Sequence, residues 1–191
     1  MEHTNNANVR ERSYKVVFMG NGGAGKTTMV KRMLTGEFER KYLPTVGVEV
    51  HPLKYNTNHG RIILNVWDTA GQEQFGGLRD GYYLQGDAGV IFTCTNSPRT
   101  SVREAVEYSK DFRRMCPEAP MFIWNNIIAG CSPVEPDIFA PLDEFPQYDV
   151  NAKNAFYEDA VVNLLKTLTG EPDLCWLDAD PITPADCTPL A

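Results

Sequence analysis

The residues best suited to chemistry lie near the start of the chain, where GNGGAGKT at 20–27 matches the spacing G-x-x-x-x-G-K-[ST]. Glycines in such a loop lack a Cβ and tolerate positive φ, so backbone N–H groups can wrap a phosphate chain at close range. Lys26 would supply a positive charge for the β- and γ-phosphates, and Thr27 a hydroxyl for Mg²⁺. A helix that begins directly after the loop adds a dipole that favours an anion. The residues predicted to surround the phosphates are Gly22, Gly23, Ala24, Gly25, Lys26, Thr27 and Thr28.

A second polar segment, DTAGQ at 68–72, follows a β-rich run that ends at Trp67. An aspartate at the end of a strand can hold Mg²⁺ through water. Gly71 lets its backbone N–H approach a phosphate oxygen without a side chain in the way. The pattern D-x-x-G is common by chance, but it gains weight at the end of a strand and downstream of a phosphate loop. We therefore predict that Asp68 and Gly71 complete the site around residues 20–28.

The elements that must position these residues alternate between short apolar runs and amphipathic stretches. Strands are predicted at 14–19, 48–55, 61–67, 88–94 and 120–124, with a turn at 56–60 that makes an antiparallel hairpin. Helices are predicted at 26–34, from a capping box that starts at Ser101, and in a stretch that ends at Gly170. This alternation predicts an α/β fold with a mostly parallel sheet covered by helices on both faces. Ligands of such folds bind at the carboxyl ends of the strands, where residues 20–27, Asp68 and Asn125 all fall.

Composition and charge narrow the function further. The chain has 191 residues, 42% of them hydrophobic and 23% charged, as is typical of one soluble globular domain. The net charge of −7 argues against a nucleic-acid-binding surface as the main activity. Five cysteines without a C-x-x-C pair predict the reduced thiols of a cytosolic or nuclear protein. No apolar run approaches the roughly 18 residues that a membrane-spanning helix needs, so neither nucleic acid nor membrane is expected as a partner.

Three longer segments carry a resemblance to a known family. LTGEF at 34–38, KYLPTVGVEVHPL at 41–53 and NVWDTAGQEQFGGLRDGYY at 65–83 resemble Ras-superfamily small GTPases, and within them the Ran nuclear-transport GTPases. The resemblance implies a P-loop NTPase fold, the small G-domain with a six-stranded sheet, over residues 14–170. Composition predicts that the polar arm at 1–13 is disordered, and that the acidic, proline-rich tail at 171–191 is either disordered or a strand draped over the surface.

The resemblance assigns roles as well. Thr45 would close on Mg²⁺ and the γ-phosphate, so that Mg²⁺ is held by Thr27, Thr45 and, through water, Asp68. Gln72 would orient the attacking water and is the predicted catalytic residue. Residues 37–47 and 68–83 would be switch I and switch II, whose order depends on the γ-phosphate. The implied activity is GTP binding with slow GTP hydrolysis, and the implied cofactors are GTP or GDP and Mg²⁺.

One motif departs from the family. Small GTPases end the fifth strand in N-K-x-D, whose Asp accepts two hydrogen bonds from guanine, whereas this chain has NNII at 125–128. The change removes bonds worth roughly 1.5–3 kcal/mol each, and with them the group that rejects adenine. The NAK sequence at 151–153 resembles the family's S-A-K loop, so the predicted base contacts are Asn125, Asn126, Ala152 and Lys153. Two alternatives stay open: ATP as the nucleotide, and a pseudo-GTPase that engages Ran partners with weak or absent nucleotide binding.

The resemblance also implies partners and a cellular setting. These are nuclear transport receptors, an exchange factor and a GTPase-activating protein of the Ran type, in the nucleus and cytoplasm. Phe75 resembles the exposed aromatic that Ran presents to its nuclear importer, although a place in the core fits it equally well. Residues 127–150 are acidic and carry no Lys or Arg where Ran has a basic stretch. That difference predicts that this protein binds fewer partners than Ran does.

Overall fold

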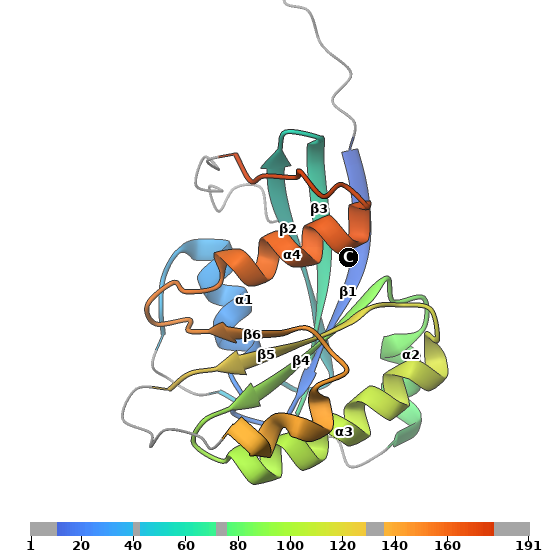
Figure 1. Cartoon of the computed structure of the whole chain (residues 1–191), viewed down its shortest axis with the longest axis vertical. Coiled ribbons are helices and arrows are strands. Elements are labelled where there is room, and N and C mark those ends of the chain that lie inside the picture. Colours follow the sequence, from blue (N-terminus) through green and yellow to red (C-terminus); the bar gives the residue numbers. More distant parts are fainter. Residues whose placement is uncertain (1–10, 40–42, 72–75, 129–135, 178–191) are drawn as a thin grey trace, which may run out of the picture.

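The structure, a computed structural model, describes residues 11–39, 43–71, 76–128 and 136–177. Its sheet has six strands in the order β2-β3-β1-β4-β5-β6 (Figure 1). β2 runs antiparallel to β3, and the other neighbouring strands run parallel. The predicted α/β fold with a mostly parallel six-stranded sheet is therefore confirmed. The strands are β1 Glu11–Gly20, β2 Val48–Thr57, β3 Gly60–Thr69, β4 Ala88–Cys94, β5 Met121–Asn126 and β6 Gln147–Val150.

Helices cover both faces of the sheet. Successive residues of a strand point to opposite faces, and β1 shows this directly. Val16 and Phe18 pack into a core with α1 and α4, whereas Val17 and Met19 pack into a second core with α3 and Tyr83 of α2. The predicted cover of helices on both faces of the sheet is therefore confirmed. The helices are α1 Lys26–Thr35, α2 Gly76–Tyr83, α3 Pro98–Met115, the 3₁₀ helix η1 Pro136–Leu142 and α4 Glu158–Thr169.

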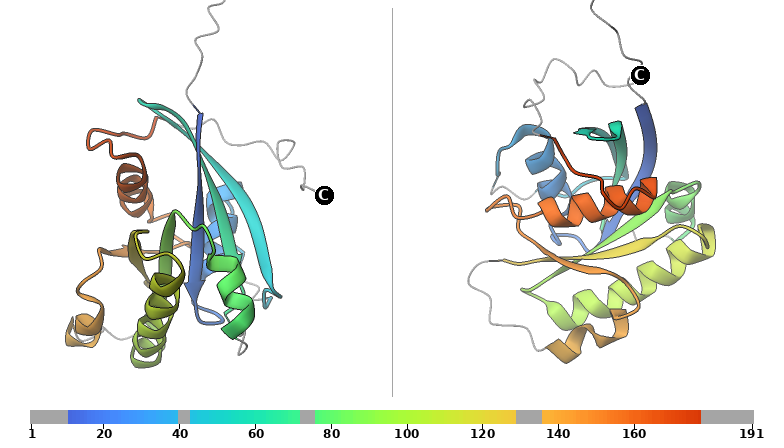
Figure 2. Two further views of the ribbon diagram at one scale, coloured as in Figure 1. Left: turned by 90° about the vertical axis from the view of Figure 1, so that its right-hand side faces the viewer. Right: turned by 45° about the horizontal axis from the view of Figure 1, so that its top comes forward.

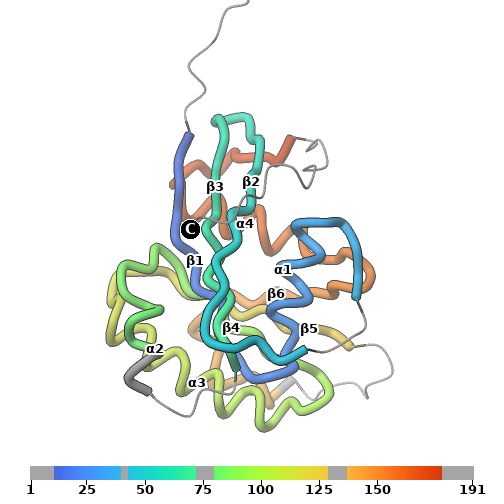
Figure 3. The backbone as a smooth tube through the Cα atoms, turned by 180° about the vertical axis from the view of Figure 1, so that it is seen from behind, coloured from blue at the N-terminus to red at the C-terminus, as the bar shows by residue number. Residues whose placement is uncertain are grey.

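The three strands β1, β2 and β3 have 10 residues each and extend beyond β4 and β5 at one end of the sheet (Figure 2). The view from behind shows β2, β3 and β1 as neighbouring strands (Figure 3). The carboxyl ends of β1, β3, β4 and β5 share the opposite end of the sheet, because these strands are parallel. The predicted site therefore lies at one end of the sheet and the β2–β3 turn at the other. Among the described residues, no helix has the length and apolar character needed to cross a bilayer.

The prediction that a capping box at Ser101 opens α3 is wrong. The helix begins at Pro98, whose missing N–H costs nothing in the first turn and whose fixed φ suits a helix start. Ser101 lies inside the helix and is 3% exposed. Its Oγ accepts a hydrogen bond from the Cys94 backbone N–H at 3.0 Å, which ties α3 to the end of β4. Its hydroxyl therefore holds α3 against the end of β4 instead of capping the helix.

Several boundaries differ from the predictions. β1 begins at Glu11 rather than Tyr14, and β5 continues to Asn126. The acidic stretch at 127–150 contains β6, which the hydrophobic pattern did not locate because this edge strand has only 4 residues. Residues 171–177 lie in the tail that was predicted to be either disordered or a strand draped over the surface. In the structure, Leu174 is only 2% exposed and Trp176 forms a β-bridge with Thr57. This part of the chain packs on the domain.

Candidate functional site

The loop between β1 and α1 has the backbone shape that a phosphate site requires. Gly20, Gly23 and Gly25 all have positive φ, at 133°, 80° and 100°, a region that residues with a Cβ rarely adopt. The Ala24 backbone N–H donates to Asn21 O at 3.1 Å and closes the turn. α1 then begins at Lys26, so the free N–H groups of its first turn border the loop. The predicted phosphate-binding loop therefore has the expected strand, loop and helix context.

Lys26 lies inside this loop. Its Nζ donates to Gly20 O at 2.7 Å and to Asn21 O at 3.0 Å, and the residue is only 5% exposed. Burial lowers the pKa of Lys26 to about 8, while the Asp68 carboxylate acts in the opposite direction. A buried ammonium held by two neutral carbonyls gains strongly from an anion. Its environment thus favours a bound phosphate.

Thr27, Thr45 and Asp68 meet at the mouth of the loop, as predicted for Mg²⁺ ligands. The Thr27 hydroxyl donates to Asp68 Oδ2 at 2.5 Å, and Thr45 Oγ1 lies 2.8 Å from Thr27 Oγ1. Asp68 Oδ1 is buried and has no hydrogen-bond partner within the described ranges, and burial raises the pKa of this carboxyl. A buried carboxylate with an unsatisfied oxygen is costly unless a cation is nearby. Two hydroxyls and this carboxylate fit a Mg²⁺ ion, which prefers oxygen ligands.

Gly71 closes the site from the other side. A Cβ built on Gly71 would lie 2.1 Å from the Gly22 nitrogen and 2.7 Å from Asn21 O, so the end of β3 is pressed against the phosphate loop. Tyr108 of α3 lies behind it, with its hydroxyl 3.4 Å from Gly71 O. Only glycine allows this approach. The structure therefore brings Gly71 to the phosphate loop.

A cleft open to solvent runs past Lys26, Thr27, Thr45 and Gly71. The Lys31–Glu39 ion pair, 3.0 Å long, borders it and joins α1 to the segment before Thr45. Sequence reasoning missed both residues, although Lys31 lies one helical turn after Thr27 and so on the same face of α1. The cleft is lined by Gly22, Gly23, Gly25, Lys26, Thr27, Thr28, Lys31, Glu39, Leu43, Pro44, Thr45 and Gly71.

The end of β5 lies next to the loop, but its side chains are engaged within the protein. Asn126 Nδ2 donates to Ala24 O at 2.9 Å and packs against Gly25. Asn125 is 7% exposed, accepts from the Thr93 hydroxyl at 2.7 Å and donates to Asp149 Oδ1 at 3.3 Å. These two residues therefore join β4, β5 and β6 to the phosphate loop.

Ile128 occupies the position where the family has its guanine-binding Asp. Its backbone N–H donates to Thr95 Oγ1 at 2.9 Å, and its side chain offers no acceptor. Thr95 is another contact that sequence reasoning missed. Its hydroxyl fixes the backbone after β5, which leaves an aliphatic side chain where a carboxylate would bind guanine.

The predicted base-covering loop follows β6. The Asn151 Nδ2 donates to Ile127 O at 2.7 Å, and its Oδ1 accepts from the Asn154 N–H at 2.9 Å. These bonds hold the loop beside the end of β5, with Ala152 buried and Lys153 exposed. Gln72 and Phe75 lie outside the described residues, so their predicted roles remain predictions.

A comparison with protein families matches residues 15–128 to the family described as "Ras of Complex, Roc, domain of DAPkinase". The matched region runs from β1 through the phosphate loop, Thr45, Asp68 and Gly71 to the end of β5. It contains every predicted metal ligand and phosphate contact. The match concerns the GTPase domain in general, and the Ran-type assignment stays a prediction. Since the matched residues make up more than half of the 191 residues, the chain belongs to the Roc family of Ras-superfamily GTPase domains.

Proposed function

We propose that this protein is a Mg²⁺-dependent GTP-binding switch that hydrolyses GTP slowly. The observation that carries this proposal is the convergence of Thr27, Thr45 and Asp68 beside the phosphate loop. These residues come from α1, from the segment before β2, and from β3. A ligand that combines phosphate with a divalent cation would contact all three residues at once. The buried Asp68 Oδ1, which no described residue hydrogen-bonds, supports the same conclusion.

The residues of the chain act mainly by position and charge. Lys26 would bind the β- and γ-phosphates from within the loop, and the Gly71 N–H would approach the γ-phosphate from the opposite side. Bound Mg²⁺ would neutralise negative charge on the phosphate oxygens. No residue needs to form a covalent bond, and Gln72 is proposed to orient the attacking water. Hydrolysis is therefore expected to be slow until a partner protein completes the site.

The switch itself would lie in two segments that meet the phosphate loop. Thr45 belongs to the predicted switch I and contacts Thr27, while Gly71 belongs to switch II and contacts the loop at Gly22. Both contacts lie where a γ-phosphate and its cation would bind. Loss of that phosphate would release both segments together. Partner proteins would then distinguish the two nucleotide states.

We further propose that the switch acts with Ran-type partners in nucleocytoplasmic transport, in nucleus and cytoplasm. Support comes from the segments at 34–38, 41–53 and 65–83, which resemble Ran. Purified protein loaded with a non-hydrolysable GTP analogue should retain an importing receptor that the GDP-loaded protein does not. Phe75→Ala should weaken this retention. Equal binding of both loaded forms, or of neither, would overturn the transport role while leaving the nucleotide switch intact.

A second candidate is a pseudo-GTPase that serves as a binding module. Ile128 and the internally bonded Asn126 favour it, because both remove polar contacts to the base that the family uses. The two candidates differ in the nucleotide that copurifies with the protein. Stoichiometric GDP or GTP, released by unfolding in a chelator, supports the switch, and ATP or ADP would move the specificity to adenine. A folded, empty protein that gains no thermal stability from GTP and Mg²⁺ would establish the pseudo-GTPase.

A further inference from the structure

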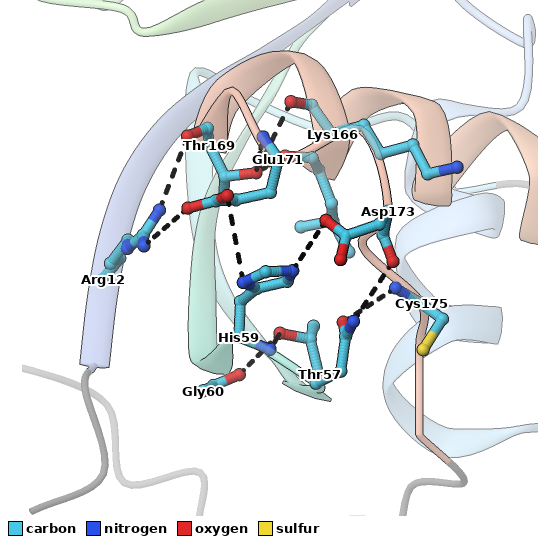
Figure 4. A network of polar contacts seen from close by, with 11 residues as sticks. Arg12, Thr57, His59, Gly60, Lys166, Thr169, Glu171, Asp173 and Cys175 are labelled. Carbon is cyan, nitrogen blue, oxygen red and sulfur yellow. Dashed lines mark hydrogen bonds and ion pairs between the residues drawn. The ribbon is translucent and has the colours of Figure 1, made fainter.

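Three side chains that commonly bind metals meet at the end of the sheet opposite the phosphate loop. His59 stands in the turn between β2 and β3, and Glu171 and Asp173 follow the end of α4 (Figure 4). His59 Nε2 lies 3.0 Å from Asp173 Oδ1, and His59 Nδ1 lies 3.9 Å from Glu171 Oε2. One donor atom from each residue lies within 4.8 Å of the other two. We propose that these three residues bind a divalent transition metal ion, with Zn²⁺ favoured.

The donor set selects this class of ion. One imidazole nitrogen and two carboxylate oxygens suit Zn²⁺ and its neighbours in the first transition row. Mg²⁺ and Ca²⁺ prefer oxygen alone, which is what the site at Thr27, Thr45 and Asp68 offers. The protein would therefore carry two cation sites of different chemistry. Three protein ligands would leave one tetrahedral position for water.

The donor atoms are close enough for a single ion. Tetrahedral donors at bond lengths of about 2.1 Å lie roughly 3.4 Å apart. One donor atom from each of the three residues already lies within 4.8 Å of the other two, and His59 Nδ1 lies 3.9 Å from Glu171 Oε2. An ion takes only one ring nitrogen, so the carboxylate at the other nitrogen must rotate toward it. Asp173 has room to rotate, because its side chain is 73% exposed. The imidazole is 26% exposed, so the ion can enter from solvent.

The backbone that carries the donors is fixed without any metal. Asn58 Nδ2 donates to Asp173 O at 3.1 Å, and Asn58 Oδ1 accepts from the Cys175 N–H at 2.9 Å. Leu174, between these two contacts, is buried. The His59 N–H donates to Thr57 Oγ1 at 3.2 Å. The turn and the segment after α4 are therefore already aligned, and little order has to be gained when an ion binds.

The two carboxylates attract a cation to this cluster, and a nearby arginine reduces that attraction, so we expect moderate affinity. One of the two carboxylates already pairs with a cation, since Arg12 Nη2 lies 3.2 Å from Glu171 Oε1. Arg12 reduces the attraction for a cation, but it engages Oε1 and leaves Oε2 toward His59. Groups that hydrogen-bond a ligating carboxylate in this way fix its orientation. Arg12 thus acts as a positioning residue for Glu171.

The test is calorimetric titration of the full chain with ZnCl₂ in excess Mg²⁺, which fills the all-oxygen site. We expect one Zn²⁺ per protein, with affinity reduced more than about tenfold in His59→Gln and in Asp173→Asn. Zn²⁺ should also raise the thermal unfolding temperature of the wild type and of neither variant. Asp173→Asn changes an exposed side chain, so it tests the site even if His59→Gln disturbs the turn.

Two matched controls separate this site from surface binding. His51→Gln removes a histidine of β2 whose Nε2 lies 3.2 Å from Glu49 Oε2, and this variant should bind Zn²⁺ as the wild type does. Cys175→Ser removes an exposed thiol two residues after Asp173 and should also retain binding. Co²⁺ bound in place of Zn²⁺ should lack a thiolate charge-transfer band. The proposal is overturned if His59→Gln and Asp173→Asn bind Zn²⁺ like the wild type, or if the wild type binds none.

Discussion

Gly71 and Gly22 are so close that a methyl group on Gly71 would lie 2.1 Å from the Gly22 nitrogen. This contact joins the segment after β3, in the predicted switch II, to the phosphate loop. Because the obstacle is backbone, it cannot be relieved by rotating a side chain. Any side chain at position 71 would therefore clash with the phosphate loop, which explains why the residue is glycine.

Gly71→Ala should therefore destabilise the protein by about 1–3 kcal/mol, as overpacking does, and weaken the binding of triphosphate more than that of diphosphate. Urea unfolding and nucleotide titration measure the two effects. Gly81→Ala is the control, since nothing lies within 4 Å of its added methyl group. It should stabilise α2 by about 0.5–1 kcal/mol. Equal behaviour of the two variants would refute the close approach.

Asp68→Asn should leave the nucleotide-free protein as stable as the wild type or more stable, because it removes a buried charge with an unsatisfied oxygen. The same change should abolish the extra stabilisation that Mg²⁺ gives to nucleotide-bound protein, about 2.7 kcal/mol at 100 times the dissociation constant. Thermal unfolding with and without Mg²⁺ measures this increment. Asp159→Asn on the exposed first turn of α4 should keep it. A Mg²⁺ increment that survives in Asp68→Asn would exclude this carboxylate from the metal site.

Lys26 makes nucleotide binding depend on pH. Its pKa in the folded, ligand-free protein is about 8 against an ordinary 10.5, so the unfolded chain binds more protons between these values. The free energy of unfolding of the ligand-free protein should therefore increase as pH rises through this window. Below pH 8 the protein bears the full cost of burying the charged lysine. A phosphate favours the charged lysine, so binding should take up a proton above pH 8 and weaken as pH rises further. Calorimetry in buffers of different ionisation enthalpy measures the uptake, and Lys26→Arg should show none.

Ile128→Asp should raise the ratio of GTP affinity to ATP affinity by at least about tenfold, since each hydrogen bond to a charged acceptor contributes roughly 1.5–3 kcal/mol. Competition binding with both nucleotides measures the ratio. Ile127→Asp adds the same charge one residue earlier, where the side chain is 37% exposed, and should leave the ratio unchanged. No gain from Ile128→Asp would mean that the base does not lie against this residue.

Leu174→Ala should destabilise the domain by about 2–5 kcal/mol, because a buried leucine that anchors residues 171–177 is lost. Leu177→Ala, where the side chain is 48% exposed, should cost less than about 0.5 kcal/mol. Chemical denaturation gives both values. Similar small costs for the two would show that the segment after α4 contributes little to the fold.

The sequence by itself determined the phosphate loop, the hairpin and the end of α4. Each depends on local rules: GNGGAGKT supplies glycines where φ is positive, residues 56–60 supply a turn, and Gly170 ends a helix in the left-handed conformation. It also placed Thr27 and Asp68 in one site, since strand ends in a parallel sheet meet at one edge, and the family resemblance added Thr45 to that site. Short-range pattern and fold class were sufficient for these.

Only the tertiary structure decided the rest, because those features depend on contacts between distant residues. Ser101 looked like a cap, yet its hydroxyl bonds the end of β4. Residues 171–177 looked like the start of a tail, yet Leu174 is buried and Asn58 bonds the backbone on either side of it. The closeness of His59 to Glu171 and Asp173 follows from that docking. A sequence pattern records which residues are polar or apolar, whereas the partner of each is chosen only when the chain packs.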